Sequence, residues 1–251
     1  MNKASPNTRA QAMILAAGRG ERMRPLTDHT PKPLLRVKGM SLIQWSIELL
    51  AQSGHTDIVI NTAWLGDQIH QTMGDVFTSS SNPIRIHYSN ETQDFGGALE
   101  TAGGIVRALP VLDDVFWVVA GDVWMPGFVF SPALMESFRE SDDWAHLWLV
   151  PNPEHNLKGD FGIASNGKCF HAKQQQGAHL YTFSTVALYK REFFTPPICE
   201  LAMGNPKGER LALAPLLQNA MERNKVSGTI YTHAWTDVGT PERLNLLNST
   251  P

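Results

Sequence analysis

The residues between Leu15 and Leu34 could bind an anion through backbone and side chains together. Gly18 and Gly20 come directly after an apolar stretch, and glycines leave backbone N–H groups able to face a negatively charged ligand. Four cations stand in the same stretch, namely Arg19, Arg22, Arg24 and Lys32. Phosphate oxygens accept hydrogen bonds from both kinds of donor, so the stretch is typical of a triphosphate site. A solvated basic turn after a strand is the alternative that the local chemistry leaves open.

Two better-known phosphate-binding loops fit this sequence less well. The dinucleotide pattern G-x-G-x-x-G begins at Gly18, but Met23 stands where its third glycine should be. A later segment nearly matches the P-loop pattern, but Cys169 replaces the hydroxyl residue that holds Mg²⁺ in such loops. The pair Asn166-Gly167 inside that segment favours a β-hairpin with a type I′ turn. Neither motif therefore predicts the nucleotide site.

Three aspartates stand at the predicted ends of strands or hairpins. Asp122 follows the apolar run 115–120, which would place its carboxylate at the carboxyl edge of a parallel sheet, where ligands bind. Proteins usually hold Mg²⁺ through one or two carboxylates together with substrate phosphates, so Asp122 and Asp237 are candidate metal ligands. Asp160 is a candidate acceptor for a substrate hydroxyl. For Asp122 and Asp237, capping of a turn or helix is the alternative interpretation, and Asp160 could simply begin a hairpin strand.

The hydrophobic pattern predicts the elements that position these residues. Short apolar runs alternate with helical segments over the first half, which favours βαβ units with helices on both faces of the sheet. From about residue 151 to 210 the pattern predicts a small antiparallel β lobe. We expect one α/β domain over residues 1–251, with a Rossmann-like, mainly parallel twisted sheet and a loose lead-in at 1–10. Strands are expected at 12–17, 57–63, 84–89, 115–120, 145–150, 160–165, 168–172, 181–189 and 229–236, and helices at 42–52, 67–77, 98–109, 213–223 and from 241.

The composition excludes several classes of protein. The 251 residues include 24 acids and 21 bases, for a net charge of −3, and no basic run, so neither nucleic acid nor an anionic membrane surface is an expected partner. No apolar stretch approaches the roughly 20 residues of a membrane span, and no signal-peptide pattern opens the chain, which favours a cytoplasmic protein. Cys169 and Cys199 lack zinc-site spacing and are expected to be reduced thiols. The sequence carries no signal for an oligomeric state.

Motifs along nearly the whole chain give it a family resemblance. LAAGRGERMRPLT at 15–27, followed by PKPL at 31–34, resembles the signature of the sugar-phosphate nucleotidylyltransferases. The segments LETAGGI at 99–105, GDVW at 121–124 and WTDVGT at 235–240 continue the resemblance. It implies the nucleotide-diphospho-sugar transferase fold and Mg²⁺-dependent transfer of UMP from UTP to a sugar 1-phosphate. Within the family, the motifs most resemble those of enzymes that use N-acetylmuramate α-1-phosphate in peptidoglycan recycling.

The resemblance also implies roles for individual residues. The triphosphate would be lined by Ala17, Gly18, Gly20, Glu21 and Arg22, and the α-phosphate would be contacted by Lys32. Uracil and ribose would lie near Glu91 and Thr101. The sugar would face Gly159, Asp160 and Ser184. Mg²⁺ would be shared by Asp122 and Asp237, and catalysis would depend on Lys32, Arg22 and Asp122.

Some positions depart from the family pattern and leave alternatives open. Ala120 stands where an asparagine is more usual, and Ala102 and Thr185 stand where glycines are more usual. These departures bear on the sugar more than on the chemistry. The same reaction on glucose or mannose 1-phosphate or phosphocholine, or with dTTP or GTP as donor, is one alternative. A non-catalytic sensor of sugar nucleotides is another, although such proteins commonly lose the lysine or a metal carboxylate, and both are present here.

Overall fold

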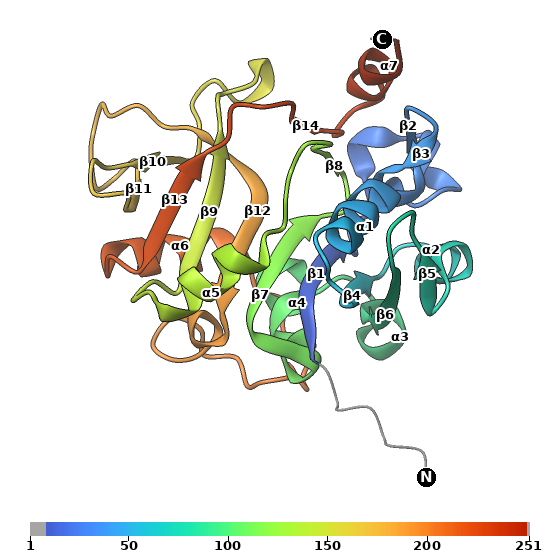
Figure 1. Ribbon diagram of the computed structural model, residues 1–251, viewed down its shortest axis with the longest axis horizontal. Helices are drawn as coiled ribbons and strands as arrows, with labels where there is room; N and C mark the ends of the chain where they lie inside the picture. Colours follow the sequence, from blue (N-terminus) through green and yellow to red (C-terminus); the bar gives the residue numbers. More distant parts are fainter. Residues whose placement is uncertain (1–8, 250–251) are drawn as a thin grey trace.

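The computed structural model describes residues 9–249 as an α/β fold around one eight-stranded sheet (Figure 1). Most of the predicted lead-in at 1–10 lies outside the described residues. In spatial order, the strands of the sheet are β13 (Val226–Ile230), β9 (Ala145–Val150), β12 (Thr182–Lys190), β7 (Leu112–Ala120), β1 (Ala10–Ala16), β4 (Asp57–Thr62), β6 (Pro83–Asn90) and β5 (Val76–Thr78). Three two-stranded sheets consist of β2 (Arg36–Val37) with β3 (Met40–Ser41), β8 (Val123–Trp124) with β14 (Thr236–Asp237), and β10 (Phe161–Ile163) with β11 (Cys169–His171).

The sheet is mainly parallel, as predicted. β1 pairs in parallel with β4 and β7, β4 with β6, and β9 with β13. β12 is antiparallel to both of its neighbours, and β5 is antiparallel to β6. The chain first adds strands on one side of β1 and then returns to place β7 on the other side. Ligands of open α/β sheets bind at the carboxyl ends of the strands at such a switch in strand order, which here lies between β1 and β7.

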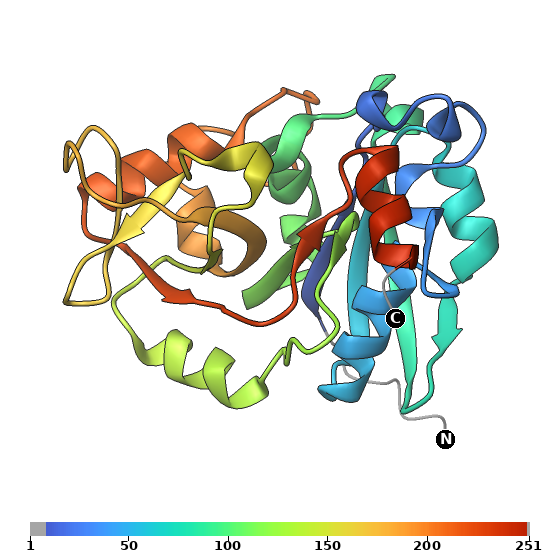
Figure 2. The same ribbon diagram turned by 90° about the horizontal axis from the view of Figure 1, so that it is seen from above.

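Helices cover both faces of the sheet (Figure 2). Alternate residues of a strand point to opposite faces, so Met13 packs with one apolar cluster and Ile14 with the other. The first cluster contains residues of α4 (Glu100–Ala108) and α6 (Leu213–Glu222). The second contains residues of α1 (Leu42–Gln52), α2 (Gly66–Met73) and α5 (Pro132–Glu140). Among residues 9–249, no helix combines the length and apolar character needed to span a bilayer.

The C-terminal segment crosses from one half of the fold to the other. In Figure 1 it leaves β13 at the edge of the sheet, passes through β14 and ends in α7 (Pro241–Ser249) beside β2 and β3. Leu244 of α7 packs with Val37, and the Asn248 side-chain amide donates a hydrogen bond to the Arg36 carbonyl at 3.0 Å. Through β14 this segment places Asp237 opposite Val123 of β8, which lies shortly after the end of β7.

Several predicted elements differ from those of the structure. The helix expected at 67–77 ends at Met73, because Gly74 adopts a left-handed φ of 68°, and Val76–Thr78 forms edge strand β5 instead. The strand expected at 229–236 begins earlier, at Val226, and it pairs in parallel with β9, so the second half is not purely antiparallel.

The hairpin of β10 and β11 is present, but its turn is not of type I′. Such a turn needs a positive φ at both central residues, and only Gly167 has one, at 79°. The Gly167 N–H donates to the Ala164 carbonyl at 2.9 Å, and the Ala164 N–H donates to the Lys168 carbonyl at 2.8 Å. A three-residue loop with glycine at its left-handed position accounts for these bonds.

Candidate active site

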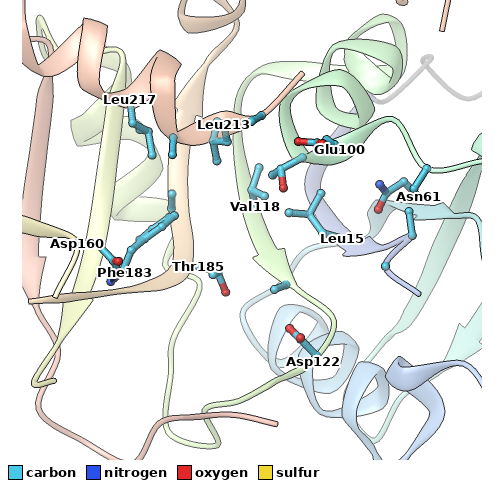
Figure 3. Close-up of a pocket in the computed structure, with 18 of the residues that line it drawn as sticks. Leu15, Asn61, Glu100, Val118, Asp122, Asp160, Phe183, Thr185, Leu213 and Leu217 are labelled. Carbon is cyan, nitrogen blue, oxygen red and sulfur yellow. Dashed lines mark hydrogen bonds between the residues drawn. The ribbon is translucent and has the colours of Figure 1, made fainter. Parts of the chain in front are cut away.

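A pocket of about 610 Å³ opens at the carboxyl edge of the sheet, at the switch between β1 and β7 (Figure 3). Its walls come from the ends of β1 and β7, from β12, and from the first turns of α4 and α6. Six of the predicted site residues line it: Ala17, Gly18, Lys32, Thr101, Asp122 and Asp160. The others, which are Gly20, Glu21, Arg22, Glu91, Gly159, Ser184 and Asp237, lie outside its lining.

The glycine-rich loop after β1 turns tightly at Gly20. Gly20 has a left-handed φ of 68°, and an added Cβ would stand 3.1 Å from the Thr27 side chain and 3.2 Å from Lys32 Cβ. Gly18 faces open space, with no heavy atom within 4 Å of where a Cβ would be. Glycine at position 20 therefore allows the loop to pack closely against Lys32. The backbone at Gly18, by contrast, is open to a ligand.

Two of the four loop cations are engaged within the loop itself. Arg19 donates to the Thr27 carbonyl at 2.9 Å and to Asp28 at 3.0 Å, and its guanidinium lies 3.8 Å from the centre of the Trp64 ring. Arg24 pairs with Asp28 at 2.8 Å. The hydrogen bond from Arg19 is the main reason that the pKa of Asp28 lies below its ordinary value. Arg19 and Arg24 therefore shape the loop, while Arg22 is exposed to solvent and Lys32 reaches the pocket.

Lys32 and Asp122 form an ion pair that lines the pocket. The Lys32 ammonium donates to Asp122 Oδ2, and the two side chains are 11% and 32% exposed. Asp122 is separated from the end of β7 by Gly121 alone, and the Gly121 N–H donates to the Leu15 carbonyl at 2.8 Å, which fixes the end of β7 against β1. This arrangement presents one ammonium and one carboxylate to any ligand at the switch point.

Asp237 lies on the strand paired with the segment after Asp122. It stands opposite Val123, and the Val238 N–H donates to the Asp122 carbonyl oxygen at 2.9 Å. Its Oδ1 accepts from Arg243 at 2.5 Å and lies 2.9 Å from His155 Nε2. The pairing thus brings two carboxylate residues from distant parts of the sequence to adjacent backbone positions.

The two carboxylates suit a hard cation such as Mg²⁺, because that ion prefers oxygen ligands and takes one or two carboxylates plus phosphate oxygens and water. Within residues 9–249 there is no group of three or more potential metal-binding side chains that could form a cage. A cation held here would therefore need oxygen ligands from its substrate.

Glu91 lies behind the pocket wall, fully buried. Its two oxygens accept from the Asn61 side-chain amide and the Leu99 N–H, both at 2.7 Å, and Asn61 in turn accepts from the Ala16 N–H at 2.9 Å. Burial raises the pKa of Glu91 against the opposing effect of these hydrogen bonds. Of this network, Asn61 lines the pocket, so Glu91 holds a pocket residue in place.

The opposite wall of the pocket comes from the lobe and β12. Asp160 accepts from the Phe183 N–H at 2.8 Å, and both residues line the pocket. Ser184 is fully buried, and its hydroxyl accepts from the Val186 N–H at 3.1 Å, so the lining residue after Phe183 is Thr185. In Figure 3 the Asp160 and Asp122 side chains lie on opposite sides of the pocket.

The three positions that depart from the family pattern differ in whether they reach the pocket. Ala120 and Thr185 line the pocket, whereas Ala102 is fully buried and its N–H donates to the Leu211 carbonyl at 2.9 Å. Trp64 and Trp124, which come just after β4 and β7 in the sequence, do not line the pocket. Trp124 packs edge-on against Trp45 instead.

Comparison with known proteins identifies the family. The sequence profile described as nucleotidyl transferase matches residues 11–250. The chain belongs to this family. It is 46% identical over 240 residues to a Neisseria meningitidis protein named N-acetylmuramate alpha-1-phosphate uridylyltransferase, covering 93% of this chain and 95% of that protein. A Caulobacter vibrioides protein of the same name is 36% identical over 116 residues, covering 45% of this chain and 46% of the other.

Solved structures confirm the fold of this nucleotidyl transferase. A putative glucose-1-phosphate thymidylyltransferase from Bacillus anthracis superposes with a TM-score of 0.72 at 22% identity, covering 95% of this chain and 94% of the other. The predicted mainly parallel, helix-flanked sheet is confirmed, as is the predicted resemblance to sugar-phosphate nucleotidylyltransferases.

Sequence reasoning missed some residues that line the pocket of this nucleotidyl transferase. Asn61 is one, and its signal was a polar residue near the carboxyl end of a predicted strand. Thr185 was noted only as a departure from the family pattern, because the sequence does not reveal its backbone angle. Tyr189 was assigned to a strand and proves to be a fully buried residue at the wall of the pocket.

Proposed function

We propose that this nucleotidyl transferase transfers UMP from UTP to N-acetylmuramate α-1-phosphate, giving a UDP-sugar and pyrophosphate. Its 46% identity across nearly the full length of a protein named for this activity supports the choice of substrates. The observation that carries the proposal is the pocket at the strand switch, which is lined by Lys32, Asp122 and Asp160 together. A role in peptidoglycan recycling belongs to the same proposal.

The reaction needs two phosphates brought together in the pocket. A phosphate oxygen of the sugar 1-phosphate attacks the α-phosphorus of UTP, the new oxygen–phosphorus bond forms, and the bond to the bridging oxygen of pyrophosphate breaks. Positioning and charge neutralisation supply most of the rate in such transfers. No covalent intermediate on the protein is required. Lys32 neutralises charge on the α-phosphoryl oxygens, and Arg22, on the exposed loop, binds the leaving pyrophosphate.

Asp122 and Asp237 would hold Mg²⁺ in this proposal. Such an ion would supply positive charge that offsets the charge of the substrate phosphates. In the structure each carboxylate accepts a hydrogen bond from a cationic side chain. Lys32 donates to Asp122, and Arg243 donates to Asp237. Each carboxylate is thus paired with a cation of the chain itself before a ligand arrives. Lys32, which lies on Asp122 in the structure, would be the residue of the chain that contacts the α-phosphate.

The test is pyrophosphate release by the purified protein with Mg²⁺, UTP and a panel of phosphate-bearing acceptors. The panel contains N-acetylmuramate, N-acetylglucosamine, glucose and mannose 1-phosphates and phosphocholine, and each is also assayed with dTTP and GTP. Release confined to UTP with N-acetylmuramate 1-phosphate supports the proposal. Release with another pair would retain the chemistry and replace the substrate. If no acceptor causes pyrophosphate release but the protein still binds sugar nucleotides, a non-catalytic sensor is favoured instead.

A further inference from the structure

Thr185 combines two unusual features in the wall of the pocket. Its φ is 65°, in the left-handed region, which β-branched residues avoid. Its Oγ1 is shielded from solvent and has no hydrogen-bond partner among residues 9–249. Strained residues persist where the surrounding structure fixes them, and they cluster at ligand sites.

Neighbouring contacts hold the backbone on both sides of Thr185. The Phe183 N–H donates to Asp160 Oδ2 at 2.8 Å, and the Trp235 indole N–H donates to the Ser184 carbonyl at 3.1 Å. The Ser184 hydroxyl accepts from the Val186 N–H at 3.1 Å. Thr185 thus lies between backbone groups that the lobe, the C-terminal segment and Ser184 hold in place.

The pairing of β12 with β9 is irregular at the same point. Phe183 pairs with Leu149 and Ala187 with Leu147, so β12 carries two more residues than β9 across this stretch. Extra residues in one strand re-aim the side chains within them. The irregularity accounts for the backbone angle of Thr185 and for its place in the pocket lining.

The position of Thr185 indicates which part of a substrate it would meet. In the view of Figure 3 it is seen between Phe183 and Asp122. Under the proposed function, the Phe183 side of the pocket would take the sugar and the Asp122 side would take the triphosphate. The phosphate of the sugar 1-phosphate must lie between these two sides, because it is bonded to the sugar and attacks the α-phosphorus. A shielded hydroxyl without a partner is costly unless a ligand supplies one.

We propose that the Thr185 hydroxyl donates a hydrogen bond to the attacking phosphate of the sugar 1-phosphate. Thr185 is then a substrate-positioning residue that contacts the nucleophile and not the nucleotide. The inference rests on the proposed function, since it takes a sugar 1-phosphate as the second substrate. A hydrogen bond to a charged group contributes more than one between neutral groups, so its loss should weaken binding of that substrate by about 10-fold to 100-fold.

The test compares Thr185→Val with Thr185→Ser and the wild type. Valine keeps the β-branched shape and removes only the hydroxyl, whereas serine keeps the hydroxyl. We expect Thr185→Val to raise the KM for N-acetylmuramate α-1-phosphate by about 10-fold to 100-fold with the KM for UTP within about 2-fold of wild type. Thr185→Ser should restore most of the affinity. The matched control is Thr78→Val, at an exposed position of edge strand β5, which should leave both constants unchanged.

A second measurement separates phosphate from sugar contacts. Calorimetric titration of N-acetylmuramate α-1-phosphate should show the same loss of affinity in Thr185→Val, while titration of unphosphorylated N-acetylmuramate should show no difference between variant and wild type. Equal loss for both ligands would assign the hydroxyl to the sugar and overturn the proposal. An unchanged KM for the sugar 1-phosphate in an active Thr185→Val enzyme would also overturn it. If the wild type releases no pyrophosphate with any sugar 1-phosphate, that result refutes the proposed function, and it refutes this inference as well.

Discussion

Replacing Lys32 by methionine should remove most of the activity and little of the stability. Among the described residues that line the pocket, Lys32 is the one cation, and its side chain is only 11% exposed. A charged donor preorganised in such a shielded position is worth about 2.7–4 kcal/mol to the transition state, so kcat should fall by about 10²-fold to 10³-fold. Methionine keeps the unbranched stem that lies beside Gly20.

The stability cost should be small because Asp122, the partner of Lys32, is 32% exposed and can be hydrated once the ammonium is gone. A partly exposed ion pair contributes up to about 1 kcal/mol, which for a protein of this size shifts the Tm by roughly 2–4 °C.

The assay is steady-state pyrophosphate release at saturating UTP and N-acetylmuramate α-1-phosphate, with thermal melting of the same samples. Lys207→Met, at an exposed loop position, is the matched control and should behave as wild type in both measurements. A Lys32→Met enzyme whose kcat stays within about 3-fold of wild type would refute the assignment of Lys32 to the α-phosphate. A fall in Tm far beyond the expected range would instead show that the ion pair is mainly structural.

Three further predictions follow from the carboxylates and the buried network. Asp122→Asn should lower kcat by at least about 10²-fold and should raise the Mg²⁺ concentration needed for half-maximal rate, measured by pyrophosphate release across a Mg²⁺ series. Gly104→Ala should destabilise the fold by about 1–3 kcal/mol in urea unfolding, because its Cβ would stand 2.5 Å from Glu91 Oε1. The pKa of Glu91 is raised in the folded state, so its contribution to stability is full below its ordinary pKa of 4.5 and is lost as the pH rises through the raised value. Glu91→Gln cannot titrate, so urea unfolding from about pH 4.5 upward should show a weaker fall in stability for the variant, and identical pH profiles would contradict the raised pKa.

The sequence predicted the parallel core of the fold because its strands are buried on both sides and read as continuous apolar runs. Helix 42–52 and strand 145–150 match the structure at both ends. Edge strand β5 was missed because its exposed residues depend on pairing with β6, which local pattern does not report. β13 was placed too late for a similar reason, since its pairing with β9 determines where it begins.

The candidate site was predictable where chemistry follows from residue type and strand position. Lys32, Asp122 and Asp160 line the pocket that the glycine loop and strand ends indicated. The sequence could not show which loop cations are available to a ligand. Arg19 and Arg24 form ion pairs with Asp28, and these pairs depend on how the loop folds back.

The measurement that tests the central claim most directly follows the α-phosphate of UTP. The wild-type protein is incubated with Mg²⁺, N-acetylmuramate α-1-phosphate and UTP carrying a radioactive α-phosphate, and the products and the protein are separated. The account predicts that the label moves into the UDP-sugar in an amount equal to the pyrophosphate released, with none bound to the protein. Label in free UMP, or covalently attached to the protein, would contradict direct transfer to the sugar phosphate.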